Sequence, residues 1–371
     1  MLQSLWNKTK EKNLTTYVML IVTYIIVEIL ILSGVLSYQL QGILVPVCTY
    51  VIMAISLNLV VGILGELSLG HAGFMCVGAF LGGSFSICME QAIPNGFIRF
   101  LLALLVGAIS AGIIGFLIGM PVLRLNGDYL AIVTLAFGEI IKNLVNLVYL
   151  GYDSKGLHFS MNDLASLNME EDGVLAIKGA QGVTGMPTVA NFTVGLILIL
   201  FTVFIITNLV KSRDGRAIMS IRDNQIAAES VGINITKYKL MAFTISASLA
   251  GMAGAFYAHN FSNIKATTNN FGYNMSIMIL VFVVLGGIGN IKGSIIAATI
   301  LTLLPEVLRF MSQYRMLVYA IVLIVMMLFN WSPKARLYKE RVSVKCRMMW
   351  VSRKEKWKLS HKASNQKKEE Q

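Results

Sequence analysis

The sequence has few charged residues and few cysteines. Charged residues make up 13% of its 371 positions, whereas 56% are hydrophobic and the mean hydropathy is +0.70. A soluble globular domain carries about 25% charged residues, so this composition excludes a water-soluble fold. The four cysteines, Cys48, Cys76, Cys88 and Cys346, form no CxxC pair and stand beside no histidine cluster. We therefore expect neither a metal site nor a disulfide framework.

Two motifs that would supply chemistry are also missing. No G-x-x-x-x-G-K-[ST] phosphate-binding loop occurs; the nearest approach, residues 286–294, has Lys292 before its last glycine instead of after it. The chain therefore binds no ATP by that route, and transport would depend on a separate ATPase, on an ion gradient or on neither. No G-x-S-x-G occurs either, and Ser68 with His71 is too little to predict an intramembrane protease.

Long apolar runs, in contrast, recur along nearly the whole chain. A transmembrane helix needs about 20 apolar residues, and the runs near that length cover residues 15–38, 41–64, 68–89, 98–119, 129–150, 191–210, 240–258, 273–290, 294–311 and 315–331. The third run is rich in glycine and could form a broken helix. The first run is long enough to stay in the membrane, so no signal peptide is expected. The sequence predicts an all-α polytopic membrane protein of about ten transmembrane helices, with a permease domain over residues 15–333.

Basic residues set the predicted orientation. The N-terminal segment 1–14 carries Lys8, Lys10 and Lys12, and the tail 334–371 holds thirteen Lys or Arg against four Glu, a net charge of +9. Basic flanks stay on the cytoplasmic side, so both termini are predicted to be cytoplasmic and the number of spans to be even. The tail is interpreted as an anchor attracted to anionic membrane lipid. Nucleic-acid binding is not expected, since no fold positions the tail for it.

Ten spans place the two long loops on opposite sides of the membrane. The loop 151–190 carries five acidic residues against two lysines and falls outside, whereas the basic loop 211–239 falls in the cytoplasm. Arg309 and Arg315 near an outer turn run against this rule.

The cytoplasmic loop 211–239 has a helical pattern although it is polar. It holds six Lys or Arg and three Asp or Glu, and Ile218, Ile221 and Gln225 fall on one helical face. Gly232 is a natural residue for the position just after a helix. A short amphipathic helix of this kind either docks into a groove on a partner or lies at the lipid interface, and the residues alone leave both open.

Several stretches resemble the branched-chain amino-acid ABC transporter permeases of the LivM family. They are GELSLGHAGFMCVGAF (65–80), LRLNGDYLAIVTLAFGEIIK (123–142), GAQGVTGMP (179–187), GRAIMSIRDNQIAAESVGINITKYKLMAFTISASLAGMAGAFYA (215–258), LGGIGNIKGSIIAATILTLLPEVLR (285–309) and YRMLVYAIVLIVMMLF (314–329). They occur in order over about residues 55–330. The coupling segment departs from the family pattern by reading Ala-Ala-Glu-x-x-Gly, and the tail is longer and more basic than usual.

The resemblance implies a type II-importer-like permease in a bacterial plasma membrane. Its expected partners are two cytoplasmic ABC ATPases, a second, dissimilar permease subunit, an extracytoplasmic solute-binding protein and membrane lipid. ATP would be hydrolysed by the partners, and this chain would bind no cofactor. Leucine, isoleucine and valine are the expected substrates. The residues expected to couple to the ATPase are Arg216, Ile218, Ile221, Arg222, Asp223, Ala228, Glu229 and Gly232.

Ionisable residues inside the spans are candidates for the translocation path. A charge at the bilayer centre costs about 2.5–3.5 kcal/mol on insertion scales. Glu139 and Lys142 are spaced i,i+3 on one helical face and form either a structural pair or a polar lining of the path. Pro305, Glu306 and Arg309 near the outer end of a span are candidates for a gate or for contact with the binding protein.

Ser68 and His71 complete the set of path candidates. His71 is expected to hydrogen-bond Ser68 or a neighbouring helix, and no second ligand near it in sequence supports a metal site.

Two other functions remain open at this point. A urea or short-amide permease of the same fold would share these motifs, and distant relatives move sugars such as ribose. A gradient-driven secondary transporter would show internal repeats with paired broken helices, and no such repeat is evident.

Overall fold

The computed structural model describes residues 2–331, apart from positions 36, 126, 154–155, 168, 170–172 and 312–313. The basic tail 334–371 lies outside the described residues, as do Cys346 and the acidic residues 170–172, and the expectations for them stay predictions. The chain divides into two compact units, residues 1–307 and 308–371, and each is described by itself.

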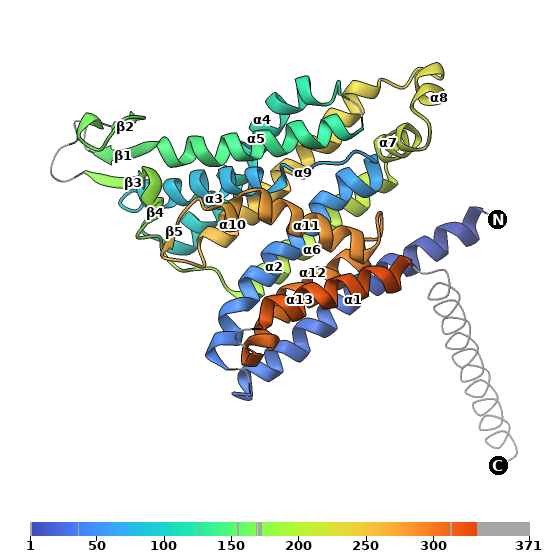
Figure 1. The fold of residues 1–371 in the computed structure, drawn as a ribbon, viewed down its shortest axis with the longest axis horizontal. Coiled ribbons are helices and arrows are strands. Elements are labelled where there is room, and N and C mark those ends of the chain that lie inside the picture. Colours follow the sequence, from blue (N-terminus) through green and yellow to red (C-terminus); the bar gives the residue numbers. More distant parts are fainter. Residues whose placement is uncertain are drawn as a thin grey trace, which may run out of the picture. The chain divides into compact units, whose positions relative to one another are not determined.

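Helices dominate the described residues and follow the predicted spans closely (Figure 1). In the first unit they are α1 (Leu2–Leu32), α2 (Tyr38–Asn58) with the π-helical turn η1 (Leu59–Leu64), α3 (His71–Cys88), α4 (Gly96–Val122), α5 (Asp128–Leu147), α6 (Phe192–Lys211), α7 (Arg213–Asp223), α8 (Gln225–Ser230), α9 (Ile235–Ala258), α10 (Thr268–Phe271), α11 (Tyr273–Gly286) and α12 (Ile291–Val307). The second unit holds the 3-10 turn η4 (Leu308–Met311) and α13 (Arg315–Trp331).

The polytopic helical architecture is confirmed. Eight helical segments in the described part of the chain are long and apolar enough to cross a membrane. The helices α12 and α13 have 17 residues each, so the total of ten spans and the cytoplasmic termini remain predictions. The predicted boundary between the spans at 273–290 and 294–311 was wrong by three or four residues. Gly287 and Gly289 adopt φ values of +95° and +79° and form a turn there.

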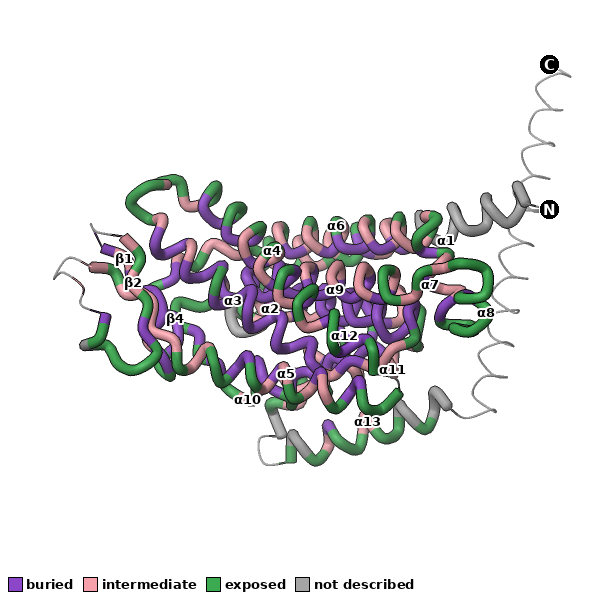
Figure 2. The backbone as a smooth tube through the Cα atoms, turned by 90° about the horizontal axis from the view of Figure 1, so that it is seen from above, coloured by how far each residue is buried: buried purple, intermediate pink, exposed green. Residues whose placement is uncertain are grey.

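Three helices make the centre of the first unit. The apolar segments of α2 with η1 and of α3 are 94% and 89% buried within the chain, whereas that of α1 is only 11% buried. Figure 2 shows this difference, with buried backbone concentrated in α2, α3 and α9. The outer helices therefore present apolar surface to lipid or to other subunits.

Small residues bring α3, α4 and α9 together. A Cβ atom on Gly78 would lie 2.0 Å from the Gly251 carbonyl oxygen, and one on Gly251 would lie 2.3 Å from the Gly107 carbonyl oxygen. Such contacts let helix backbones pack closely where lipid offers no hydrophobic driving force. The glycine-rich third span is thus an unbroken helix from His71 to Cys88, preceded by a non-helical segment at 65–70.

A small antiparallel sheet occupies the region predicted as an outer loop. Its strands β1 (Tyr149–Asp153), β2 (Gly156–Ser160), β3 (Val174–Lys178), β4 (Val183–Thr184) and β5 (Asn263–Ile264) are ordered β2-β1-β3-β4-β5. Strand β5 comes from the segment after α9, so the sheet joins two connections that are distant in sequence. Gly182 allows this junction, because a Cβ there would lie 1.9 Å from the Ile264 carbonyl oxygen.

Candidate functional site

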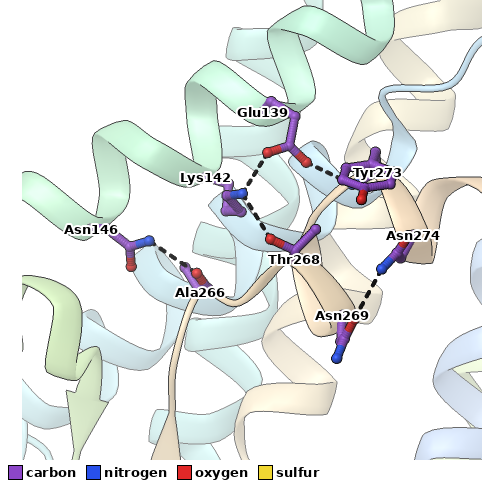
Figure 3. Close-up of polar contacts among 8 residues, drawn as sticks. All are labelled: Glu139, Lys142, Asn146, Ala266, Thr268, Asn269, Tyr273 and Asn274. Carbon is purple, nitrogen blue, oxygen red and sulfur yellow. Dashed lines mark hydrogen bonds and ion pairs between the residues drawn. The ribbon is translucent and has the colours of Figure 1, made fainter.

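An ion pair links α5 to the start of α11 (Figure 3). The Lys142 Nζ lies 2.5 Å from the Glu139 Oε2 and donates a second hydrogen bond to the Thr268 Oγ1 at 3.2 Å. The Glu139 Oε1 accepts from the Tyr273 backbone N–H at 2.7 Å. The predicted i,i+3 pair is therefore confirmed as a contact, and it also joins two segments about 130 residues apart.

The helix break at Gly272 explains why a carboxylate lies at this point. Helix α10 ends at Phe271 and α11 begins at Tyr273, so first-turn N–H groups of α11 face α5. A helix N-terminus attracts negative charge, and the Glu139 carboxylate lies there with the Lys142 ammonium as its counter-charge. The side chains of Glu139 and Lys142 are 23% and 10% exposed.

Polar side chains are exposed along the seam between α5 and α10–α11. Asn143 on α5 and Asn269, Tyr273 and Asn274 on the other side are all exposed, and the Asn274 amide donates to the Asn269 side chain at 3.0 Å. Both helical segments are long and apolar enough to span the membrane. Asn143 lies in the last five residues of α5, and Asn269, Tyr273 and Asn274 lie in the first seven residues of the segment Thr268–Gly286. The exposed polar groups of this seam are therefore gathered near one end of both segments.

Backbone N–H groups around the start of α3 form hydrogen bonds to both α5 and α11. The Leu69 N–H donates to the Thr134 Oγ1 of α5 at 3.0 Å, and the Ala72 N–H donates to the Ser276 Oγ of α11 at 3.1 Å. Ser68 and His71 flank these contacts and are 0% and 1% exposed. The four path candidates therefore belong to one region, in which Glu139 is partly exposed and Lys142, Ser68 and His71 are buried.

His71 bonds to a neighbouring helix and not to Ser68. Its Nε2 lies 2.8 Å from the Ser56 Oγ, and the Ser56 hydroxyl donates to the Met53 carbonyl at 2.9 Å. Since that hydroxyl has a single proton, the His71 Nε2 is the donor to Ser56. The histidine thus ties α3 to α2. The Ser68 Oγ is buried and has no hydrogen-bond partner among the described residues.

The loop 211–239 forms two short helices, each capped at its start. The Ser212 Oγ accepts from the Gly215 N–H at 3.0 Å at the start of α7, and the Asn224 Oδ1 accepts from the Ala227 N–H at 3.0 Å at the start of α8. Such caps satisfy N–H groups that the helix itself leaves without partners. Gly232 adopts φ +85° directly after α8, as its predicted role requires.

Two cationic side chains fix this loop to the segment after α2. The Arg222 Nη1 donates to the Gly62 carbonyl at 3.1 Å, and Lys239 forms an ion pair with Glu66. Lys239 is 2% exposed and also donates to the Gln225 Oε1 at 3.3 Å. These contacts connect α7 and α8 to residues 62–66.

The predicted coupling residues divide into an inner and an outer group. Their buried members pack within this chain: Ile218, Ile221 and Ala228. Their exposed members are Arg216, Arg222, Asp223, Glu229 and Gly232. The predicted apolar face of α7 thus anchors the loop.

Sequence reasoning missed two apolar side chains at the tip of the loop. Ile226 and Val231 are 81% and 75% exposed. In the sequence, Ile226 and Val231 stand among polar and charged residues of the loop, and this pattern could have indicated a contact with a partner.

The three outer gate candidates are divided between the two units in the sequence. Pro305 and Glu306 are in the last turn of α12, and Arg309 is in η4 of the second unit. Among the described residues, no three His, Cys, Asp or Glu side chains gather as a metal site would require.

Residues 39–329 match the protein family described as the permease component of the branched-chain amino acid transport system. The chain belongs to this permease family. The permease is 35% identical over 311 residues to the high-affinity branched-chain amino acid transport system permease protein LivM of Salmonella typhimurium strain LT2, covering 80% of this chain and 69% of the relative. LivM of Escherichia coli K12 is 34% identical over 307 residues, with the same coverage.

A third relative covers much less of the permease. The ribose import permease protein RbsC of Escherichia coli K12 is 30% identical over 126 residues, which is 32% of this chain and 39% of that protein. No solved structure is significantly similar to the permease.

Family membership settles the class of function. The permease is the membrane component of an ABC importer and not an enzyme. With its apolar helices, it is a multi-pass protein of the bacterial inner membrane.

Proposed function

We propose that this permease forms half of a path for leucine, isoleucine and valine, with the α5–α11 seam as its wall. The observation that carries the proposal is the row of exposed polar side chains at Asn143, Asn269, Tyr273 and Asn274. A second, dissimilar permease subunit would cover this face and enclose the path.

The ion pair suits a zwitterionic substrate. An amino acid brings one ammonium and one carboxylate, which are the two charges that Lys142 and Glu139 already balance against each other. Passage of the substrate would exchange this internal pair for two pairs with the substrate, so that no charge loses its partner at membrane depth. In this proposal Ser68 and His71 support the wall from below.

Energy would enter through the loop 211–239. We assign the exposed Ile226 and Val231, together with the exposed Arg216 and Glu229 of the same loop, as the contact with a cytoplasmic ATPase. One such ATPase would dock on each permease subunit and hydrolyse ATP, and this chain would bind no cofactor itself. The buried Ile218 and Ile221 would keep the docking surface attached to the permease.

On the outer side, we propose contact with a solute-binding protein. The strands β1–β5 offer a formed surface there, and Pro305, Glu306 and Arg309 remain candidates for the gate or for this contact.

Cysteine accessibility tests the path. In a variant whose natural cysteines are replaced by serine, Asn143→Cys and Asn274→Cys should react with a membrane-impermeant thiol reagent, and leucine with its binding protein should slow the reaction. Ile113→Cys is the control, because Ile113 is 56% exposed on the apolar surface of α4. Equal reactivity at all three positions, with no effect of leucine, would contradict the assignment.

Competition for uptake separates the remaining substrate classes. Leucine transport should be inhibited by valine and isoleucine and not by urea or ribose. Strong inhibition by urea would favour the short-amide alternative.

A further inference from the structure

The π-helical turn η1 at the end of α2 is attached to the loop 211–239. Helix α7 lies beside it (Figure 1), and the Arg222 Nη1 of α7 donates to the Gly62 carbonyl at 3.1 Å. The same side chain packs on Gly65, where a Cβ atom would lie 2.6 Å from the Arg222 Cγ. π-Helical turns are rare and occur frequently at functional sites, so the contacts of η1 on its other attachments are informative.

Asn58, the last residue of α2, attaches the same turn to the connection between α11 and α12. Its side chain is 0% exposed. The Asn58 Oδ1 accepts from the Gly289 N–H at 2.8 Å, and the Asn58 Nδ2 donates to the Ser294 Oγ at 3.1 Å. These partners lie 231 and 236 residues further along the chain. A single buried amide therefore holds both the α11–α12 connection and the first part of α12.

Gly62 lets the α11–α12 connection approach η1 closely. A Cβ atom on Gly62 would lie 2.1 Å from the Asn58 Oδ1 and 2.4 Å from the Gly289 nitrogen. Gly289 itself has φ +79°, a conformation that glycine adopts without strain. Gly62 thus contacts Gly289 on one side, and its carbonyl accepts from Arg222 on the other.

Helix α11 extends from this connection to the seam with α5. A Cβ atom on Gly293 would lie 1.7 Å from the Gly286 carbonyl oxygen, so the end of α11 and the start of α12 are in close contact. At the other end of α11, the Tyr273 N–H donates to Glu139. The 14 residues of α11 correspond to about 21 Å along a helix axis. A continuous series of contacts therefore runs from α7 through η1 and α11 to α5.

We propose that η1 is the joint through which movement of α7, driven by the ATPase, reaches α11, and that Asn58 and Gly62 are positioning residues for transport. Coupling between distant sites is carried by chains of packed groups and hydrogen bonds of this kind. The inference rests on the proposed docking of the ATPase at the loop 211–239. The two residues hold the α11–α12 connection at a fixed position relative to α7, so that leucine moves when ATP is hydrolysed.

Two variants with two matched controls test the joint. Asn58→Leu removes both hydrogen bonds with a side chain of similar size, and Gly62→Ala separates η1 from the α11–α12 connection. Thr49→Val is the control for the first, because Thr49 is also 0% exposed in α2 and its hydroxyl bonds to the Val45 carbonyl of the same helix. Gly42→Ala is the control for the second, because a Cβ atom on Gly42 of α2 would meet nothing within 4 Å.

Leucine uptake and ATP hydrolysis are measured on the same proteoliposomes of the assembled transporter. Asn58→Leu and Gly62→Ala should each lower the leucine moved per ATP hydrolysed by about fivefold, the lower end of the usual coupling between sites, with unchanged association of the ATPase. A structural role alone would lower the amount of assembled complex and leave this ratio unchanged. An unchanged ratio in both variants, or an equal loss in the controls, overturns the proposal. Failure of the proposed docking appears instead as normal ATPase association of Ile226→Asp, so the two failures are distinct.

Spin-label distances test the joint without altering it. In a variant whose natural cysteines are replaced by serine, labels are attached at Asp214→Cys of α7 and at Ile288→Cys of the α11–α12 connection, both of which are exposed positions. The distance between them should stay constant between the nucleotide-free and ATP-bound transporter, while the distance from Asp214→Cys to Ile113→Cys on α4 changes. A change in the first distance, or none in the second, overturns the proposal.

Discussion

Neutralising the two members of the α5 ion pair should have unequal effects. Lys142→Met leaves the Glu139 carboxylate with its hydrogen bond from the Tyr273 N–H, with the N-terminus of α11 and with a side chain that is 23% exposed. Glu139→Gln leaves the Lys142 ammonium, in a side chain that is 10% exposed, with neutral acceptors in place of a counter-charge: the Thr268 hydroxyl and the new amide oxygen. The loss of stability should therefore be larger for Glu139→Gln, which leaves a buried ammonium without its counter-charge, than for Lys142→Met.

The contacts set the expected magnitudes. Removing one partner of a fully buried ion pair costs about 3–5 kcal/mol. Because the pair is partly exposed and each side chain keeps one hydrogen bond, we expect a loss of about 2–3 kcal/mol for Glu139→Gln and of about 1 kcal/mol for Lys142→Met. Replacing both residues removes both charges, so the double variant should be within about 1 kcal/mol of the unmodified protein.

The measurement combines stability with transport for the same four proteins. The free energy of unfolding would be measured in mixed micelles, and leucine uptake would be normalised to the amount of permease in the membrane. If the pair has only a structural role, the double variant should regain both the free energy of unfolding and the leucine uptake of the unmodified protein. A pair that also lines the path predicts that the double variant Glu139→Gln/Lys142→Met recovers stability and not uptake.

Two results would refute this reasoning. Additive destabilisation in the double variant would mean that the two side chains do not interact energetically. Normal uptake by both single variants would remove Glu139 and Lys142 from the path.

Three further predictions concern the loop and the sheet. Ile226→Asp should weaken association with the ATPase by about tenfold or more, as for an apolar interface residue, and should leave membrane insertion normal. Co-purification with the ATPase checks this, and Thr236→Asp is the control. Glu66→Gln should lower stability by about 3 kcal/mol because Lys239 is left buried without its counter-charge, and adding Lys239→Met should restore it in the same unfolding assay. Gly182→Ala should displace β4 from β5, which limited proteolysis of the outer region would detect as faster cleavage; an unchanged pattern would contradict the close contact.

Features encoded locally were predictable from the sequence. The apolar runs predicted the helices because a span needs a long apolar segment. Gly232 was correctly placed just after a helix, and the spacing of Glu139 and Lys142 correctly predicted their contact. Ile218 and Ile221 were correctly placed on one face of α7, although pattern alone could not show that this face packs on the permease itself.

Features that depend on distant contacts were not predictable. The sheet was missed because its strands have two to five residues and β5 follows a different helix. The partners of Glu139 at Tyr273 and of His71 at Ser56 come from other helices, and no pattern within one segment reports them. The seam at α5–α11 likewise required the three-dimensional arrangement.

Leucine uptake into proteoliposomes tests the central claim most directly. The vesicles would contain this permease, its partner permease and both ATPases, with the binding protein added outside and ATP enclosed. Leucine should accumulate only with ATP and binding protein, and Ile226→Asp should reduce this accumulation while the permease remains in the membrane. Accumulation without the ATPases, driven by an imposed ion gradient, would contradict the account.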